Sequence, residues 1–172
     1  MIFFWCFISF VILQRFGELL HAKKNAKKMY LNGAEEFDRT GYRFIVFMHI
    51  AFFVSVITEK ILLHREMGYL WKILFLIFIL AQFIRYWAVT SLGINWNTRI
   101  IAVPGSSLVS AGPYKFFRHP NYVVVVIEIA LIPLIFGCYY TAFFFSLMNL
   151  IVLKRRIGIE ESVLEIKGSE KI

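Results

Sequence analysis

The sequence predicts an all-α integral membrane protein with about five transmembrane helices. Hydrophobic residues make up 59% of the 172-residue chain, above the roughly 45–50% of soluble domains. The mean hydropathy is +0.69. The net charge is +8, and the basic residues border apolar stretches, which is typical of cytoplasmic loops rather than of a nucleic-acid surface. We therefore expect a lipid bilayer as the environment and no nucleic-acid partner.

Five stretches have the apolar character of membrane helices, which need about 20 mostly apolar residues. The run from residue 129 to residue 153 has no charge but is interrupted by Pro133 and Gly137, so it is divided into a hairpin. We expect one polytopic domain over residues 1–172, with a three-helix part (1–91) before a loop, hairpin and tail helix (92–167). The expected spans are residues 1–20, 42–63, 69–91, 122–136 and 139–153, and the tail helix covers 154–166.

Positive charge alternates between the predicted loops and sets the orientation. The second loop balances Lys60 and Arg65 against Glu59 and Glu66, and the hairpin turn has no charge. Because cytoplasmic loops carry an excess of Lys and Arg, we expect the N-terminus outside and the C-terminus in the cytosol. The excess lies in the first loop (Lys23, Lys24, Lys27, Lys28, Arg39, Arg43), the third loop (Arg99, Lys115, Arg118) and the tail (Lys154, Arg155, Arg156, Lys167, Lys171).

Several common enzyme motifs are absent from the sequence. It has no Gly-x-Gly of a dinucleotide site, no His-Glu-x-x-His metal helix and no Gly-x-Ser-x-Gly elbow. Its two cysteines, Cys6 and Cys138, are too few for a disulfide framework or a metal site. We expect no bound metal.

The long polar stretch 93–121 is a candidate functional loop, because loops of this length often carry function. Pro120 restricts the residue before it and holds His119 in an extended conformation. Tyr114 and Tyr122 add flat faces and hydroxyl groups. The same residues also suit an interfacial anchor, since aromatic and basic side chains gather at lipid headgroups. Both interpretations remain open from the residues alone.

Two further sets of polar residues lie within or beside the hairpin. On a helix, Arg156 and Glu160 are i,i+4 neighbours, and Asn149 lies on the same face. This face is either a binding surface or a solvated helix end with one salt bridge. Glu128 lies about two turns inside the fourth span, where an unpaired carboxylate costs a few kcal/mol. It is either functional or a buried partner of Arg85 or another basic group.

Three motifs occur together in the second half of the chain. They are Leu108-Val109-x-x-Gly112-Pro113-Tyr114, Arg118-His119-Pro120-x-Tyr122 and Arg156-x-x-x-Glu160-Glu161. Together, over roughly residues 92–164, they resemble the isoprenylcysteine carboxyl methyltransferase family. These are small polytopic membrane enzymes that use S-adenosylmethionine.

The resemblance implies roles for individual residues. Arg156 would face the acidic group of the acceptor. The third loop and the tail helix would form the cofactor site on the cytosolic side. The residues implied to contact S-adenosylmethionine are Leu108, Val109, Tyr114, His119, Pro120, Tyr122 and Glu160.

Departures from the family pattern indicate a particular branch. Ser106 stands where the prenylcysteine enzymes often carry His, and valines from Val123 onward replace a Gly that often follows the second motif. The short length, Asn121 and Glu128 resemble bacterial members found with type III polyketide synthases, which O-methylate alkylpyrones or alkylresorcinols. The resemblance therefore implies a lipophilic small-molecule acceptor and a type III polyketide synthase as functional partner.

We expect Arg156, Asn149 and Glu128 to contact the acceptor, with Arg156 stabilising its anionic oxygen. A hydroxypyrone ionises readily and needs no strong base, whereas a resorcinol benefits from one, for which Glu128 and His119 are candidates. Other interpretations are a carboxyl or phospholipid amine methyltransferase, an NADPH-dependent membrane reductase, and a non-enzymatic membrane scaffold.

Overall fold

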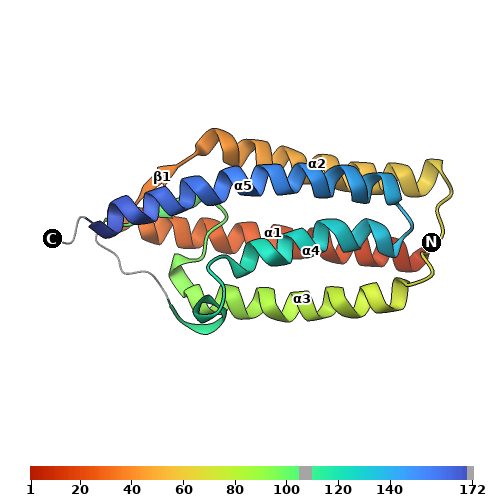
Figure 1. Cartoon of the computed structure of the whole chain (residues 1–172), viewed down its shortest axis with the longest axis horizontal. Helices are drawn as coiled ribbons and strands as arrows, with labels where there is room; N and C mark the ends of the chain where they lie inside the picture. The colour runs from red at the N-terminus through yellow and green to blue at the C-terminus, as the bar shows by residue number, and fades with distance from the viewer. Residues whose placement is uncertain (105–109, 170–172) are drawn as a thin grey trace.

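The computed structural model describes residues 1–104 and 110–169, with the side chains of the last helix up to Val163. Within these residues, five long helices run side by side along one axis (Figure 1). Two short strands and two 3-10 turns connect them. In chain order the elements are α1 (Ile2–Leu31), β1 (Glu35–Phe37), α2 (Arg39–Leu62), α3 (Trp71–Leu92), η1 (Gly93–Asn95), β2 (Ile100–Ala102), η2 (Gly112–Lys115), α4 (Pro120–Ile135) and α5 (Tyr139–Ser169).

The predicted all-α membrane fold is confirmed. By length and composition, three of the described segments are long and apolar enough to cross a membrane: α1, α2 and α3 with η1 (Trp71–Asn95). The helix α4 is a shorter apolar helix. Large side chains such as Phe47 (68% exposed), Phe83 (68%) and Phe143 (77%) lie on the outside. Whether the two hairpin helices cross the bilayer completely stays a prediction.

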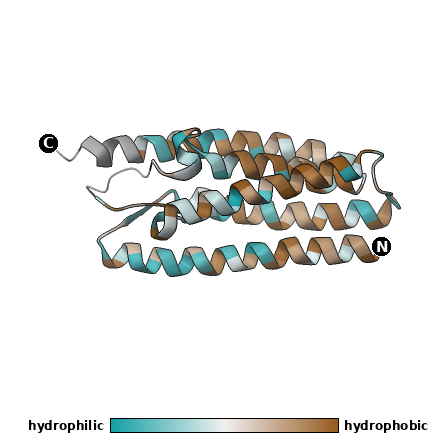
Figure 2. Cartoon of the chain, turned by 90° about the horizontal axis from the view of Figure 1, so that it is seen from below, coloured by the Kyte–Doolittle hydropathy of each residue, from teal (hydrophilic) through white to brown (hydrophobic). Residues whose placement is uncertain are grey.

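The two ends of the bundle differ in polarity. The N-terminus, the α2–α3 connection and the α4–α5 turn lie at one end, and β1 and the C-terminal part of α5 lie at the other (Figure 1). Hydrophobic residues dominate the first end and hydrophilic residues become frequent toward the second (Figure 2). The basic loops therefore share one end, as the alternating charge predicts, and the orientation across a bilayer remains a prediction.

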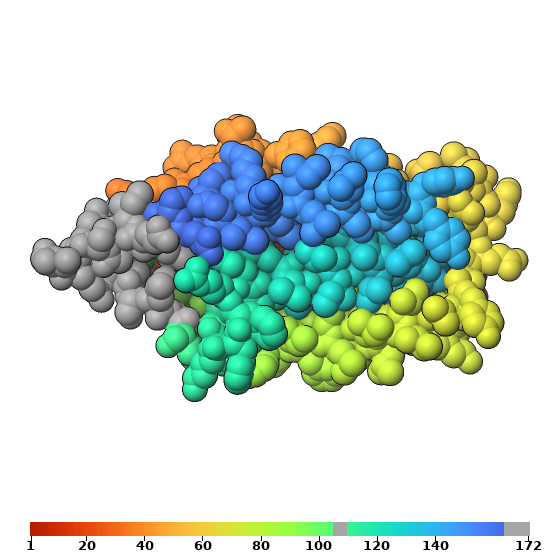
Figure 3. All heavy atoms as spheres, in the orientation of Figure 1, coloured from red at the N-terminus to blue at the C-terminus, as the bar shows by residue number. Residues whose placement is uncertain are grey.

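Two helices are longer than the sequence predicts. The helix α1 continues past residue 20 to Leu31, because the Lys- and Ala-rich segment that follows contains no Gly or Pro to stop it. The predicted tail helix is the direct continuation of the last span, so that α5 is one helix of 31 residues. On one face of the bundle, α3, α4 and α5 form a continuous surface of side chains (Figure 3).

The strand pair was not predicted from the sequence. The strands β1 and β2 are antiparallel, with Glu35 opposite Ala102 and Phe37 opposite Ile100. Each has only three residues, which is too short to show the alternation by which strands are recognised. The pair joins the loop before α2 to the loop after α3.

Local contacts hold the connections in place. The Asp38 side chain accepts a 3.1 Å hydrogen bond from the Gly41 backbone N–H and caps α2. It also accepts from Arg155 Nη2 at 2.8 Å, which joins the start of α2 to α5. In the α4–α5 turn, Gly137 has φ +71°, and a Cβ there would collide with the backbone oxygen of Glu66. Only glycine fits this position without strain.

The hydrophobic core lies toward the N-terminal end of the bundle. Phe4 and Phe136 meet edge to face with ring centroids 4.9 Å apart, and Phe7 packs on Phe78 at 5.0 Å. Such aromatic pairs add stability beyond the burial of their area. The polar residues of the candidate site lie in the opposite half of the bundle.

Candidate active site

A polar network joins α4 and α5 at the basic end of the bundle. The Tyr122 hydroxyl donates a hydrogen bond to Glu160 Oε2 and accepts one from Arg156 Nε at 2.8 Å. Arg156 Nη2 also donates to the backbone oxygen of Thr98 at 2.7 Å. Arg156 is only 6% exposed. Among the described residues no carboxylate forms an ion pair with it, so the interpretation as a solvated salt bridge with Glu160 is wrong.

His119 completes this network from the loop before α4. Its ring stacks on Tyr122, with centroids 5.3 Å apart and an interplanar angle of 16°. Its Nε2 lies 3.4 Å from Glu161 Oε1, and its Nδ1 lies 3.9 Å from Glu160 Oε2. Arg118 pairs with the same Glu161 oxygen at 3.3 Å. The loop motif and the tail motif, more than 30 residues apart in the chain, therefore form one cluster, which a simple interfacial anchor does not require.

The other predicted cofactor residues lie in different surroundings. Tyr114, in η2, is half-buried, and its burial, together with the negative charge of Glu160, raises the pKa of its phenol, so the hydroxyl stays protonated. Pro120 is fully buried and forms the first residue of α4, a position that suits proline. Leu108 and Val109, like Ser106, lie outside the described residues.

A cavity of about 530 Å³ lies beside the network, within the range of small-molecule sites. Its walls come from all five long helices, α3 contributing Arg85, and from the loop after α3. Tyr122 and Arg156 belong both to the cavity wall and to the polar network. Five apolar lining residues are also 40% or more exposed, which places an opening on the side between α1 and α2: Ile12, Phe16, Leu19, Ile50 and Val54.

Unpartnered polar groups line this cavity. Asn149 is 1% exposed, and neither its amide oxygen nor its amide nitrogen has a hydrogen-bond partner among the described residues. The indole N–H of Trp96, which is 2% exposed, is also without an acceptor there. A buried polar group without a partner costs about 1–3 kcal/mol. Such groups are expected where a ligand supplies the missing hydrogen bonds. The sequence predicts a contact of this kind between Asn149 and the acceptor.

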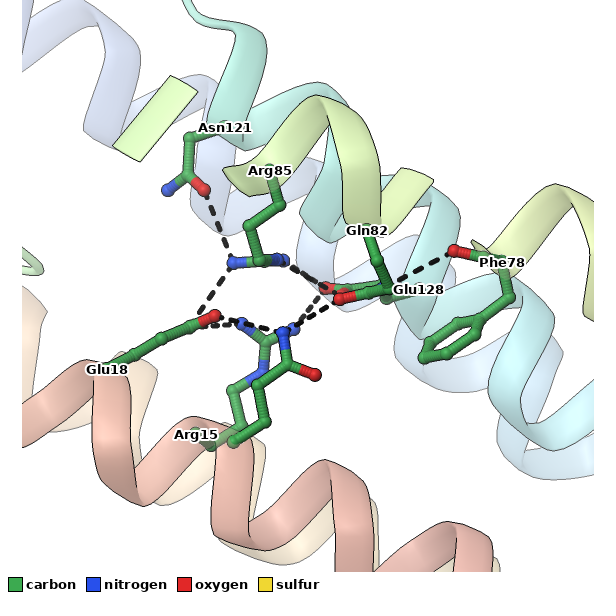
Figure 4. Close-up of polar contacts among 8 residues, drawn as sticks. Arg15, Glu18, Phe78, Gln82, Arg85, Asn121 and Glu128 are labelled. Atoms are coloured by element: carbon green, nitrogen blue, oxygen red, sulfur yellow. Dashed lines mark hydrogen bonds and ion pairs between the residues drawn. The ribbon is translucent and has the colours of Figure 1, made fainter. Parts of the chain in front are cut away.

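Glu128 is held in a buried cluster of charges (Figure 4). Its carboxylate pairs with the guanidinium groups of Arg15 and Arg85 and accepts from Gln82 Nε2 at 2.8 Å. Glu18 pairs with the same two arginines at 2.6 and 3.4 Å. The interpretation of Glu128 as a buried partner of Arg85 is thus confirmed. Its carboxylate does not line the cavity, so its direct role toward an acceptor stays a prediction without geometric support.

Comparison with known protein families identifies the family of this sequence. The sequence model of the isoprenylcysteine carboxyl methyltransferase (ICMT) family matches residues 73–166. The chain belongs to the isoprenylcysteine carboxyl methyltransferase family. This match covers most of α3, the loop after it, α4 and most of α5, and so includes every residue of the polar network. Membership of this family indicates a membrane methyltransferase.

Two bacterial relatives match nearly the whole chain. One, from Bacillus subtilis (strain 168) and named "Uncharacterized protein YpbQ", is 43% identical over 94% of this chain and 96% of its own length. The other, an "Uncharacterized protein" of Haemophilus influenzae (strain ATCC 51907 / DSM 11121 / KW20 / Rd), is 24% identical over 90% of both chains. No solved structure gives a significant match.

Sequence reasoning missed several residues of the cavity in this family member. Arg15 and Glu18 belong to α1, outside the matched region, and reach the cavity from there. Their charges inside or beside a predicted span were a usable signal, because charged groups at membrane depth are paired or functional. His49 and Trp96 gave no comparable signal, since an isolated His in an apolar helix, or a single Trp at the end of one, is commonly a packing residue.

Proposed function

We propose that this protein is an S-adenosylmethionine-dependent O-methyltransferase that acts on a lipophilic hydroxyl acceptor at the cytosolic leaflet of a bacterial plasma membrane. The proposal is based on two residues that belong both to the cavity and to the polar network. Tyr122 and Arg156 line the apolar cavity on one side and connect to Glu160 in the polar network on the other. A water-soluble cofactor and a membrane-soluble acceptor have to meet at such a boundary for a group to pass between them.

The polar network suits S-adenosylmethionine by the chemistry of its groups. The side chains of Glu160 and Glu161 are 29% and 38% exposed, so their carboxylates are accessible and can accept further hydrogen bonds from an ammonium group or ribose hydroxyls, beside those from Tyr122 and Arg118. The stacked rings of His119 and Tyr122 provide a flat apolar face, and aromatic faces also attract cations. When bound, S-adenosylmethionine supplies a methyl group on a positively charged sulfur.

The cavity suits the acceptor by its size and opening. Its lining is mainly aliphatic and aromatic, and the exposed apolar rim between α1 and α2 would face lipid tails. An alkyl chain reaches such an opening directly from the bilayer. We propose an alkylpyrone or alkylresorcinol as the acceptor, with a type III polyketide synthase as its source. This choice rests on the sequence resemblance, and the polar groups of the cavity are compatible with it.

The side chains would act mainly by positioning and by electrostatics. Arg156 is fixed by Tyr122 and Thr98 and holds a positive charge at the cavity wall, where it would stabilise an anionic acceptor oxygen. Holding the acceptor in a single orientation removes much of the entropic cost of the reaction. Because Arg156 is already oriented before an acceptor arrives, little reorganisation is needed.

Transfer of a radioactive methyl group from S-adenosylmethionine tests the proposal. Detergent-purified protein is incubated with a long-chain alkylresorcinol, a long-chain hydroxypyrone, a farnesylcysteine analogue and phosphatidylethanolamine. We expect label in one of the first two. The variant Glu160→Gln should lose cofactor binding and transfer, while Glu66→Gln, an exposed residue at the opposite end, should keep both.

The other outcomes identify the alternatives. Label in the farnesylcysteine analogue or in the phospholipid would replace the acceptor with a carboxylate or an amine. A reduced-nicotinamide difference spectrum without methyl transfer would identify a reductase. Folded protein that binds no S-adenosylmethionine would contradict the proposal and favour a non-enzymatic scaffold.

A further inference from the structure

A histidine outside all the predicted motifs lies in the wall of the cavity. His49 belongs to α2 and lines the cavity together with Asn149 and Arg156. Its Nδ1 lies 2.8 Å from the backbone oxygen of Ile45. A carbonyl oxygen only accepts hydrogen bonds, so Nδ1 carries the hydrogen in the neutral ring. The second nitrogen, Nε2, therefore has a free lone pair and no hydrogen.

The polar groups around the cavity differ in what they can bind. His49 Nε2 can accept a hydrogen bond, and within the described part of the chain the ring's hydrogen bond is the one from Nδ1 to Ile45. The Trp96 N–H only donates, and the Asn149 amide both donates and accepts, each without a partner among the described residues. A ligand that satisfies all three must carry a hydrogen-bond donor for His49 and an oxygen that accepts from Trp96 or Asn149.

We propose that His49 receives the hydroxyl proton of the acceptor, and that the cavity selects a hydroxylated ring bearing a second oxygen. This inference rests on the proposed methyl transfer and narrows its acceptor. In the proton transfer the acceptor O–H bond breaks, an Nε2–H bond forms, and the electron pair stays on the oxygen. That oxygen, stabilised by the charge of Arg156, is the nucleophile for the methyl group of the sulfonium donor, whose bonding pair remains on sulfur.

The chemistry of the head group follows from this arrangement. A carboxylate has no hydrogen to offer Nε2 at neutral pH, so an isoprenylcysteine-type acceptor would leave His49 without a partner. A hydroxyl group donates a hydrogen bond to Nε2 before the reaction. The methyl ether formed afterwards has no hydrogen, so the product loses this contact. The cavity is therefore expected to bind the hydroxy compound more tightly than its ether.

Binding without any methyl donor tests the contact directly. A radiolabelled long-chain alkylresorcinol is displaced from the wild-type protein by the unlabelled resorcinol or by its dimethyl ether. We expect a preference of about three- to tenfold for the resorcinol, the usual effect of one hydrogen bond. His49→Leu should abolish this preference, and His64→Leu, which changes an exposed residue in the turn after α2, should keep it. A preference that survives in His49→Leu would overturn the inference.

A second measurement determines the protonation state of His49 in the wild-type protein, with a more conservative variant used only to assign the signal. Imidazole nitrogen NMR of the ligand-free protein should show one neutral histidine protonated at Nδ1, whose signal is absent from His49→Gln. A His49 ring protonated at Nε2, or charged at neutral pH, would overturn the inference because it has no lone pair facing the cavity.

Turnover separates this inference from the proposed function. In His49→Gln, turnover of the alkylresorcinol should fall about a hundredfold or more, with a smaller fall for the more acidic hydroxypyrone. Wild-type protein that transfers methyl groups, with His49→Gln unchanged on both acceptors, would overturn the role of His49 and leave the proposed function intact. No transfer by the wild type would overturn the function, and the proton transfer with it.

Discussion

The variant Glu128→Gln distinguishes a structural role of this buried carboxylate from a catalytic one. Glu128 is 2% exposed and pairs with both Arg15 and Arg85. With Glu18, the cluster contains two positive and two negative side chains, so the substitution leaves one buried positive charge without compensation. Breaking a buried ion pair in this way typically costs about 3–5 kcal/mol.

That cost predicts a large change in thermal stability. For a chain of this size it corresponds to a fall of roughly 6–20 °C in Tm, measured for the detergent-purified protein by circular dichroism. The double variant Glu128→Gln/Arg85→Gln restores the charge balance and should recover much of the loss. The matched control is Glu66→Gln, which changes an exposed carboxylate and should shift Tm by less than about 2 °C.

Three results would refute this reasoning. If Glu128→Gln melts at the same temperature as Glu66→Gln, the cluster does not stabilise the fold. If it keeps its stability and loses methyl transfer, Glu128 acts in the chemistry, as the sequence alone allowed. A double variant that is less stable than the single one would show that charge balance is not the governing factor.

Three further predictions concern the cavity wall and the α4–α5 turn. Asn149→Leu removes an unpartnered buried amide, so it should stabilise the free protein by about 1 kcal/mol while weakening acceptor binding; unchanged binding would contradict the assignment. Burial raises the pKa of the Cys138 thiol to about 11, so only about one thousandth of this thiol is thiolate at pH 8. Alkylation of Cys138, followed by mass spectrometry, should therefore require unfolding. Rapid labelling of the folded protein would argue against this burial. Gly137→Ala should destabilise the protein by more than about 1 kcal/mol. The control Gly158→Ala changes a glycine inside α5 with open space around it and should stabilise the protein by up to about 1 kcal/mol. Equal effects of the two substitutions on Tm would refute the steric argument.

Much of the site was accessible from the sequence because its motifs are local. The spacing of Arg156 and Glu160 placed both on one helical face, and the loop motif placed His119 and Tyr122 at the start of α4. The pairing of these two segments followed only from family resemblance. The structure adds the physical connection, in which the Tyr122 hydroxyl bridges Arg156 and Glu160.

The limits of sequence reasoning are clearest at α1 and α2. Nothing in the order of residues shows that Arg15 meets Glu128, more than 100 residues away, or that His49 faces the same cavity as Asn149. These contacts depend on the rotation and axial position of whole helices. Several helix orientations bury similar apolar area, so hydropathy does not distinguish between them.

By itself, the sequence determined that this protein is a helical membrane protein with its basic loops at one end. Those properties follow from local composition, because a long apolar stretch has to become a helix in lipid. The tertiary structure alone decided which polar side chains share a cavity and which neutralise one another. That outcome depends on side-chain packing between helices that are distant in sequence. Rotating one helix about its axis would turn a side chain away from its buried partner and toward the lipid.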